Sequence, residues 1–347
     1  MSPSRPTRQE RHTIREVAAL ANVSVATVSH VINGTHYVSP ELTQRVLDAV
    51  RELDYVPNKV ARALTRRAIP LLALIVPDIS NPYWSCVARS VQDVTDRHGF
   101  SVIVCSSDGL LEREVRFLES LSGWISGLIF HPYHATPQHV SASFGGSVPV
   151  VILGDLGDSE SLPSNWDRVY SNNEETARMA VEHLVGLGHR RIGFIKGEEG
   201  APSGVRRLKG YRSALERAGI PFQEELAVPG DFTQTGGRLA MAKLLDLATR
   251  PSAVFCANDL SALGALGLVR ERGLRVPDDL SIVGFDDIDE AVQASPPLTT
   301  VRQSPREVGQ VIAETLVERL LGRTQSVSIG LPGELILRES SGPPGRT

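Results

Sequence analysis

The spacing of hydrophobic residues changes along this chain of 347 residues, and near the start it follows the period of an α-helix. Between residues 14 and 53, apolar side chains recur every three or four positions in three short segments. Each segment is therefore predicted to be an amphipathic helix that buries one side. A short turn, Ala21–Val23, separates the first two helices, and this spacing is typical of a helix-turn-helix.

Residues that favour helix ends mark the limits of these helices. Thr13 begins the first helix and can form a capping box with Glu16. Ser24 caps the second helix, and Asn33 with the glycine after it ends that helix, because both residues tolerate a left-handed backbone. The third helix begins at Ser39, with proline at its first position.

The second predicted helix has two different faces. Its inner face is apolar, with Val23, Val28, Val31 and Ile32. On the outer face, His30 can donate a hydrogen bond to a base edge or a phosphate, and Val25 and Ala26 can contact a thymine methyl group. Three hydroxyl side chains suit phosphate oxygens: Ser24, Thr27 and Ser29. The alternative is a solvent-facing helix in an ordinary three-helix bundle.

The segment after the third helix is short and basic. It reads "DYVPNKVARALTRR" and spans residues 54–67. Pro57 and Asn58 predict a helix start, but so short a helix is not stable alone in water. We expect it to become ordered only when it docks on DNA and on a second copy of itself.

From about residue 70, apolar runs of strand length alternate with amphipathic helices. Repeated strand–helix units predict parallel sheets covered by helices. The apolar runs fall into two sets, at about 70–170 and 190–290, which indicates two lobes. Ligands bind beyond the carboxyl ends of such strands, so the predicted ligand site is a cleft between the lobes.

Polar and aromatic side chains follow several of the predicted strands. An aromatic ring can stack on the apolar face of a sugar while polar groups bind its hydroxyls. The candidates are Asn81, Tyr83, Trp84, Arg207, Phe232, Asn258, Asp259 and Asp286. Phe232 can instead belong to the core, Trp84 to the contact between lobes, and Asp259 to a helix cap. Arg207 and Asp286 can also form a salt bridge in the free protein.

Three histidines follow a predicted strand in a loop that contains proline: His131, His134 and His139. Histidine is a common zinc ligand, but no carboxylate or cysteine lies at ligand spacing here. An exposed loop is the alternative, and no metal site is predicted.

Charge and cysteine content narrow the function further. The net charge is −4, yet residues 1–67 carry +4 and the remainder −8. A basic first segment favours a polyanionic partner, although chance variation would explain the charge equally well.

The three cysteines are widely spaced in apolar surroundings, so buried thiols are expected. No apolar run could span a bilayer and no secretory signal is found, so the cytoplasm is the expected location.

The stretches "TIREVAALANVSVATVSHVING" and "VSPELTQRVLDAVRELDYVPNKVARAL" resemble the lac repressor family of bacterial transcription regulators. The resemblance covers about residues 13–340. It implies that the second helix lies in the major groove, with Val25, Ala26 and His30 as sequence readers, and that Leu64 wedges into the minor groove. The implied DNA contacts are Ser24, Val25, Ala26, Thr27, Ser29, His30, Asn33, His36, Asn58, Ala61 and Leu64.

The same resemblance supports the candidate ligand site. Arg207 and Asp286 match the family's effector-binding arginine and aspartate, and Asn258 matches the asparagine of an "AND" motif. Two further matches are the aromatic positions after the first strand, Tyr83 and Trp84. With Phe232 they complete the predicted effector site.

The predicted fold class is α/β, with an N-terminal all-α helix-turn-helix head and a two-lobed body of parallel sheets, like a periplasmic binding protein. The predicted parts are a disordered leader at 1–12, the DNA-binding domain at 13–57, a hinge helix and linker at 58–68, an effector-binding and dimerisation domain at 69–340, and a tail at 341–347. Its N-lobe is assigned residues 69–171 and 302–325, and its C-lobe residues 172–301 and 326–340.

These observations predict a transcriptional repressor that binds a near-palindromic operator as a homodimer under the control of a small-molecule effector, with a sugar as the expected class. The tail lacks a leucine heptad, so a dimer rather than a tetramer is expected. Two alternatives are a sugar-binding protein and an α/β enzyme, each without a DNA role. No P-loop, nucleophile elbow or dinucleotide motif is found, so no catalytic residue or cofactor is predicted.

Overall fold

The computed structural model describes residues 13–33, 36–55, 70–154 and 162–345. The chain divides into two compact units, residues 1–69 and 70–347. The predicted leader and the predicted hinge helix at 58–68 lie outside the described residues. Within the described ranges, no helix is both long enough and apolar enough to cross a membrane.

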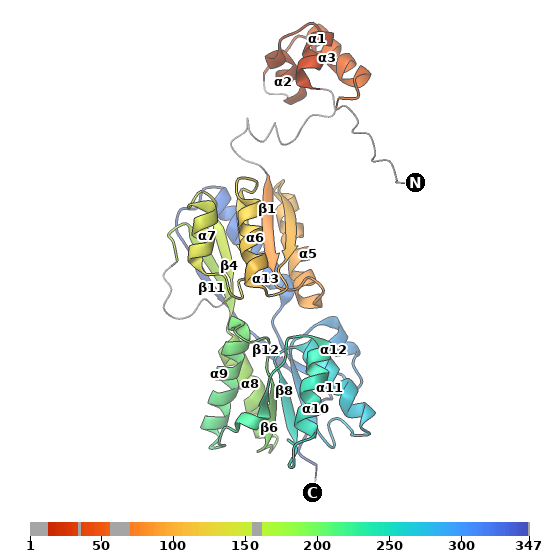
Figure 1. Ribbon diagram of the computed structural model, residues 1–347, viewed down its shortest axis with the longest axis vertical. Coiled ribbons are helices and arrows are strands. Elements are labelled where there is room, and N and C mark those ends of the chain that lie inside the picture. The colour runs from red at the N-terminus through yellow and green to blue at the C-terminus, as the bar shows by residue number, and fades with distance from the viewer. Residues whose placement is uncertain (1–12, 34–35, 56–69, 155–161, 346–347) are drawn as a thin grey trace, which may run out of the picture. The chain divides into compact units, whose positions relative to one another are not determined.

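The first unit contains the three helices that the sequence predicts (Figure 1): α1 at Ile14–Leu20, α2 at Val25–Asn33 and α3 at Pro40–Glu52. The predicted N-terminal caps are confirmed. Thr13 and Glu16 form a capping box, and Ser24 Oγ accepts a hydrogen bond from Thr27 N at 3.0 Å. The three helices pack together through Val17, Val28 and Val46, which are fully buried.

The turn between α1 and α2 is held by the third helix. Asn22 adopts a left-handed backbone there, with φ 51°. The guanidinium of Arg45 in α3 donates to the carbonyl oxygens of Ala21 at 2.7 Å and Asn22 at 3.2 Å. These bonds satisfy carbonyls that the end of α1 leaves without helical partners, so α3 fixes the angle at which α2 leaves the turn.

The second unit has two lobes, each built on a six-stranded sheet with helices on both faces (Figure 1). In the N-lobe the strand order is β11-β5-β4-β3-β1-β2, and all pairs are parallel. Its strands are β1 Leu71–Val76, β2 Ser101–Ser106, β3 Gly127–Phe130, β4 Val150–Leu153, β5 Trp166–Ser171 and β11 Ser328–Leu331. Its helices are α5 Pro82–Arg97, α6 Leu111–Leu121, α7 Pro137–Phe144 and α13 Pro305–Leu320.

The C-lobe repeats this plan, with the strand order β12-β10-β9-β8-β6-β7. Only β12 runs antiparallel to its neighbour. The strands are β6 Ile192–Ile195, β7 Ala227–Val228, β8 Ala253–Cys256, β9 Ser281–Asp286, β10 Thr299–Arg302 and β12 Glu334–Ile336. The helices are α8 Asn173–Gly186, α9 Pro202–Arg217, α10 Gln234–Leu245, α11 Asp259–Glu271 and the short α12 Asp289–Gln293, with a 3₁₀ turn at Glu224–Leu226.

Strand β1 shows why apolar runs such as "LLALIV" form buried strands. Leu72 and Leu74 pack in the cluster that includes α5 and α13, whereas Ala73 and Ile75 pack in the cluster that includes α6 and α7. Alternate side chains therefore enter two different cores, so every position of the strand has to be apolar.

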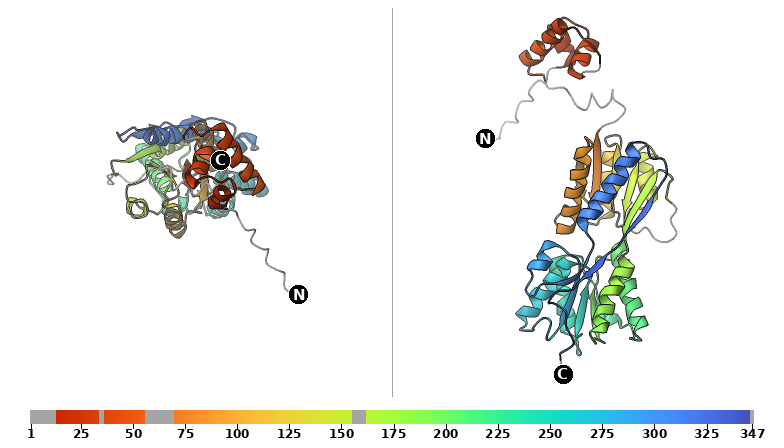
Figure 2. Two further views of the ribbon diagram at one scale, coloured as in Figure 1. Left: turned by 90° about the horizontal axis from the view of Figure 1, so that it is seen from above. Right: turned by 180° about the vertical axis from the view of Figure 1, so that it is seen from behind.

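The chain passes between the lobes three times, after β5, after β10 and between β11 and β12 (Figure 2). The predicted position of the last passage from the N-lobe to the C-lobe, between residues 325 and 326, is wrong. Ser328–Leu331 pairs with β5, so this strand belongs to the N-lobe and the chain crosses only after Leu331. The error arose because β11 is short and half exposed, and an edge strand of this kind lacks the apolar run of a central strand.

The segment predicted as a tail begins as a packed part of the C-lobe. Gly342 N donates to Ser281 Oγ at 3.0 Å, and Gly342 O lies 2.9 Å from His189 Nε2. Ser341 Oγ lies 3.0 Å from His183 Nε2. Residues 341 and 342 therefore fasten the end of the chain to α8 and β9.

A buried carboxylate binds the segment that returns to the N-lobe after β10. Asp167 in β5 accepts hydrogen bonds from Arg319 at 2.8 Å and Arg323 at 2.9 Å, and from Val327 N at 2.8 Å. Its side chain is 1% exposed. Burial acts to raise the pKa of Asp167, but the hydrogen bonds from the two arginines hold that pKa below its usual value.

We expect Asp167→Ala to lower the free energy of unfolding by about 3–5 kcal/mol, because it leaves Arg319 without its buried partner. The control is Asp246→Ala, which removes an exposed ion pair with Arg272 and should cost less than about 1 kcal/mol. Urea unfolding followed by tryptophan fluorescence measures both. Equal losses in the two variants would contradict the role given to Asp167.

Candidate functional site

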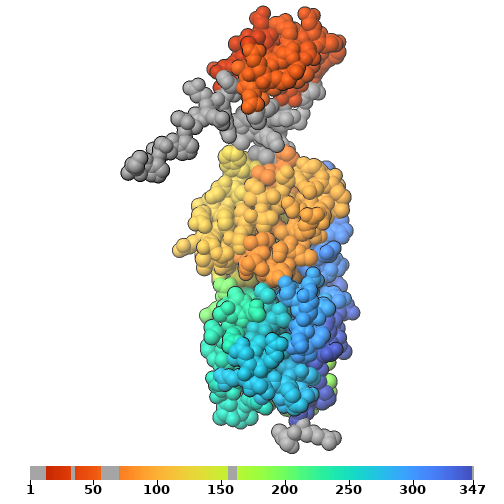
Figure 3. Space-filling model, turned by 90° about the vertical axis from the view of Figure 1, so that its right-hand side faces the viewer, coloured from red at the N-terminus to blue at the C-terminus, as the bar shows by residue number. Residues whose placement is uncertain are grey.

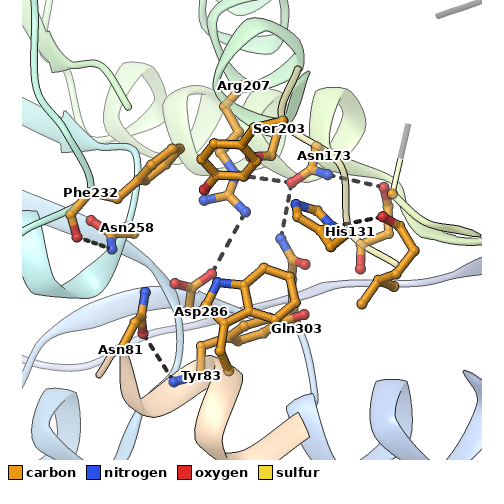
Figure 4. A pocket seen from close by; sticks show the side chains of 15 residues that line it. Asn81, Tyr83, His131, Asn173, Ser203, Arg207, Phe232, Asn258, Asp286 and Gln303 are labelled. Atoms are coloured by element: carbon orange, nitrogen blue, oxygen red, sulfur yellow. Dashed lines mark hydrogen bonds and ion pairs between the residues drawn. The ribbon is translucent and has the colours of Figure 1, made fainter. Parts of the chain in front are cut away.

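A cavity of about 50 Å³ lies between the two lobes of the body, beyond the carboxyl ends of β1, β3, β4, β5, β8 and β9 (Figure 4). Pockets for drug-sized ligands are larger, at roughly 300–1,000 Å³. On the face shown in Figure 3, the two lobes meet closely. Entry of a ligand would therefore require the lobes or the lining side chains to move.

All six residues predicted to bind an effector line this cavity: Tyr83, Trp84, Arg207, Phe232, Asn258 and Asp286. Asn81, the seventh sequence candidate in the lining, caps α5 by accepting a hydrogen bond from Tyr83 N at 3.0 Å. The structure thus brings together side chains that are up to 205 positions apart, from Asn81 to Asp286. Their role in binding remains a prediction.

Arg207 and Asp286 form a buried ion pair inside the C-lobe. Arg207 Nη2 lies 3.7 Å from Asp286 Oδ1, and both side chains are 7% exposed. The guanidinium also lies over the ring of Phe285, at 3.7 Å from its centroid, and donates to the carbonyl of Ala257. Burial raises the pKa of Asp286 above that of an exposed carboxyl, although Arg207 acts in the opposite direction. Burial likewise lowers the pKa of Arg207.

Two lining residues have an unusual backbone. Asp286 has φ 119° and Phe232 has φ 63°, although neither is a glycine. Such conformations cost free energy and persist where the surrounding structure enforces them. The ring of Phe232 occupies the space where a Cβ would stand on Gly197, so glycine at that position is required for the ring to enter.

A polar network that the sequence reasoning missed joins the ion pair to the crossing segments. Asn173 Oδ1 accepts from Arg207 Nε at 2.9 Å and from Gln303 Nε2 at 3.1 Å. Asn173 begins α8 after the first crossing, and Gln303 lies in the second. Asn173 closely follows β5, so the expectation that ligands bind beyond the carboxyl ends of strands could have identified it. Gln303 follows β10, which lies next to the edge of its sheet and lacks the apolar run that would have predicted a strand there. Other missed lining residues are Tyr133, Leu153, Gly154, Ser171 and Ser203.

Glu114 fixes the loop after β3. It is fully buried, and its carboxylate accepts from the backbone N–H groups of Tyr133 at 2.7 Å, His134 at 3.1 Å and Ala135 at 2.6 Å. The loop is thereby held against α6. This clamp presents His131 and Tyr133 to the cavity.

The exposed-loop interpretation of the three histidines is wrong for His131, which is 7% exposed and lines the cavity. His139 instead completes a capping box with Thr136. Across the described ranges, no group of three histidine, cysteine or acidic residues is placed to hold a metal ion.

The helix-cap interpretation of Asp259 is also wrong, because its neighbour Asn258 takes that role. Asn258 Oδ1 accepts from Ser261 N at 3.0 Å, and its amide donates to Phe232 O at 2.8 Å. Asp259 is fully buried and accepts from Thr300 Oγ1 at 2.6 Å and Ile288 N at 3.0 Å. Asp259 therefore ties α11 to β10 rather than capping its helix.

The predicted sequence readers Val25 and Ala26 lie on the exposed side of α2, away from its core. Val28 is fully buried, whereas Val25 is 43% exposed and Ala26 is exposed. The His30 ring meets the ring of His36 edge-on, with centroids 4.5 Å apart. Ser24, Thr27 and Ser29 are exposed or half-buried, and Asn33 is the last residue of α2. Asn58, Ala61 and Leu64 lie outside the described residues.

Together, a helix-turn-helix unit and a two-lobed α/β body with a polar cavity define a class of protein: a DNA-binding regulator whose body can take a small ligand.

Comparison with known proteins identifies the family. Residues 13–58 match the bacterial regulatory proteins of the lacI family, and residues 181–341 match the periplasmic binding protein-like domain. Catabolite control protein A of Priestia megaterium is 34% identical over 332 residues, which cover 95% of this chain and 99% of that protein. The chain belongs to the lacI family of bacterial regulatory proteins, and it is a DNA-binding regulator of transcription.

Two solved structures are similar over nearly the whole chain. The lac repressor dimer bound to operator and the anti-inducer ONPF is 29% identical, with a TM-score of 0.80, and the match covers 96% of this chain and 100% of that one. The complex of the transcriptional regulator CelR with cellobiose is 36% identical, with a TM-score of 0.71, and covers 95% and 100%.

The raised pKa of Asp286 makes stability depend on pH. The pKa of this carboxyl is higher in the folded state than in the unfolded chain, so the free energy of unfolding falls as pH rises through the interval between the two pKa values. One proton contributes a slope of at most about 1.4 kcal/mol per pH unit to the free energy of unfolding. We expect Asp286→Asn to lose this contribution, so its free energy of unfolding should fall less steeply with pH. Urea unfolding between pH 5 and 8 measures it.

The control for this experiment is Asp246→Asn, which changes an exposed carboxylate and should leave the profile as in the wild type. Some slope should survive in Asp286→Asn, because burial also raises the pKa of Asp259, to about 6. Identical slopes in the wild type and Asp286→Asn would show that Asp286 is already ionised in the folded state at pH 5.

Proposed function

We propose that this regulator binds a near-palindromic operator as a homodimer in the cytoplasm, and that a neutral sugar in the cavity between the lobes controls the binding. The observation that carries the proposal is the cavity lining, which combines aromatic rings with one ion pair and several amides. We further propose that the protein has no enzymatic activity, since its relatives are regulators.

The DNA-binding part of the proposal rests on α2. Its exposed face carries short side chains that would let the helix approach base edges in the major groove. Ser24, which caps α2, shares a 2.8 Å hydrogen bond with Thr27, so both hydroxyls stand at the helix N-terminus. That end of a helix favours phosphate oxygens. The lac repressor dimer bound to operator supports the two-fold arrangement.

The sugar part of the proposal rests on chemistry and on a relative. Tyr83 and Trp84 offer aromatic faces, whereas Arg207, Asp286 and Asn258 offer hydrogen-bonding groups that could engage hydroxyls in pairs. CelR, which is similar over nearly its whole chain, is known in complex with cellobiose. A sugar is therefore the class of effector we propose.

Control of DNA binding follows from the position of the network around Asn173. Asn173 and Gln303 stand where the chain passes between the lobes, and both bond to the network that holds Arg207. A ligand that contacts this network would favour one arrangement of the lobes over another. Coupling between two sites through such a two-state element is typically worth about 1–3 kcal/mol.

We expect His30→Ala to weaken binding to the cognate operator by about 10–100-fold, because a lost base contact costs about 1–3 kcal/mol. Binding to a random duplex should change much less. Fluorescence anisotropy at two salt concentrations, with duplexes from the region upstream of the protein's own gene, measures both. Gln44→Ala on the exposed side of α3 is the control, and equal weakening on both duplexes would contradict base reading by His30.

We expect Asp286→Ala to abolish the response of DNA binding to sugar while operator binding itself survives. The carboxylate stands in the cavity, whereas the DNA-binding face belongs to the other unit. The experiment titrates D-glucose, D-ribose and cellobiose into the protein–operator complex. Asp246→Ala should respond as the wild type does, and an unaltered response in Asp286→Ala would place the effector elsewhere.

A further inference from the structure

The imidazole of His131 is held in one orientation at the wall of the cavity. Its Nδ1 lies 2.7 Å from the carbonyl oxygen of Leu153 (Figure 4). Gly154 stands beside the same edge of the ring, where a Cβ would come within 3.1 Å of Nδ1. The glycine thus leaves room for the ring to approach the end of β4, and the hydrogen bond fixes which way the ring faces.

This orientation determines where the imidazole proton lies. A carbonyl oxygen can only accept, so Nδ1 has to carry the hydrogen and donate it to Leu153. In the neutral ring, Nε2 is then an acceptor with a free lone pair. Burial lowers the pKa of His131 to about 4, and the charge of Arg207 opposes protonation as well, so the ring is neutral at pH 7.

The acceptor at Nε2 is buried and has no hydrogen-bond partner among the described residues. The rings of Trp84 and Tyr133 pack against the imidazole, with centroids 4.5 Å and 5.6 Å from that of His131. A buried acceptor without a donor is rare in folded proteins and costly, so one that lines a cavity marks a place for a donor.

We propose that Nε2 of His131 accepts a hydrogen bond from a hydroxyl group of the effector, and that His131 is therefore a specificity-determining residue. The inference rests on the function proposed above and deepens it. A ligand lacking a donor at this position leaves the acceptor buried and unpaired, so the site discriminates against it.

The charges of the lining specify the rest of the ligand. Among the described lining residues, Arg207 and Asp286 are the charged ones besides the neutral histidine, and they face each other at 3.7 Å. The part of the lining that the structure describes therefore offers no second cation for a phosphate or a carboxylate. A neutral polyhydroxylated molecule meets both requirements, whereas a sugar phosphate meets only the hydroxyl requirement.

His131 also connects the two lobes through the ligand. It belongs to the N-lobe, whereas Arg207, Phe232 and Asp286 belong to the C-lobe. A sugar held by the C-lobe that donates to His131 would draw the lobes together. Loss of this one bond should consequently weaken both the affinity and the closing of the lobes.

The first experiment needs no ligand. Long-range ¹H–¹⁵N correlation spectra of the full-length protein, assigned with His131→Gln, report which imidazole nitrogen carries the proton. We expect the Nδ1–H form between pH 5.5 and 8, without titration in that range. An Nε2–H form would overturn the proposal, because the nitrogen facing the cavity would then be a donor.

The second experiment compares wild type, His131→Phe and His131→Gln by calorimetry. The probes are D-glucose, D-ribose and cellobiose, followed by the monodeoxy analogues of whichever binds most tightly. His131→Phe keeps a ring but removes the acceptor, so we expect roughly tenfold or greater loss of affinity. His131→Gln keeps an acceptor and should recover part of it. One deoxy analogue should bind the wild type weakly, yet bind His131→Phe as well as the parent sugar does.

The outcomes separate the two proposals. Equal affinity of a sugar for the wild type and His131→Phe, or equal affinity of the wild type for every deoxy analogue, would overturn the role of His131 and leave the sugar effector intact. Binding of no sugar from the panel to the wild type would overturn the sugar effector and the role of His131 with it. Operator binding by His131→Phe verifies that this variant is folded.

Discussion

The cavity depends on the cost of burying two charges, Arg207 and Asp286, away from water. Neither charge would be stable alone at this depth, so each is retained by the other and by neutral groups: the ring of Phe285, the carbonyl of Ala257 and the amide of Asn173. At 3.7 Å the pair is not closely hydrogen-bonded. Both side chains can therefore still form hydrogen bonds with a ligand that approaches them.

The same interaction links ligand binding to the geometry of the body. Asn173 accepts hydrogen bonds from both Arg207 and Gln303, and the two amides occupy two of the three crossing segments. A change in the partners of Arg207 would therefore alter the hydrogen bonds of Asn173 and Gln303, at the segments that join the lobes. Rigid packing on either side favours a small number of discrete arrangements over continuous bending, which suits a protein that has to report the presence of a ligand.

Much of the fold and part of the site could be predicted from sequence, because the relevant signals are local. Helix caps at Thr13 and Ser39 and apolar runs such as Leu71–Val76 are specified by neighbouring residues. The strand-end rule located Tyr83 and Asp286. His131 was misjudged because its burial depends on Glu114, 17 positions earlier, and on a carbonyl 22 positions later. Contacts of that kind carry no local signal, and the short strand β11 carries a weak one.

The order of the crossings bears on how the chain folds as it is synthesised. The N-lobe receives α13 and its edge strand β11 from residues 305–331, after the whole C-lobe sheet except β12 has been made. A nascent chain would therefore expose the part of one face of the first sheet that α13 covers beside α5 until the ribosome has nearly finished, and the second lobe can be almost complete before the first. Truncation ahead of β11 would leave the earlier lobe unfinished, although its own first five strands are all present.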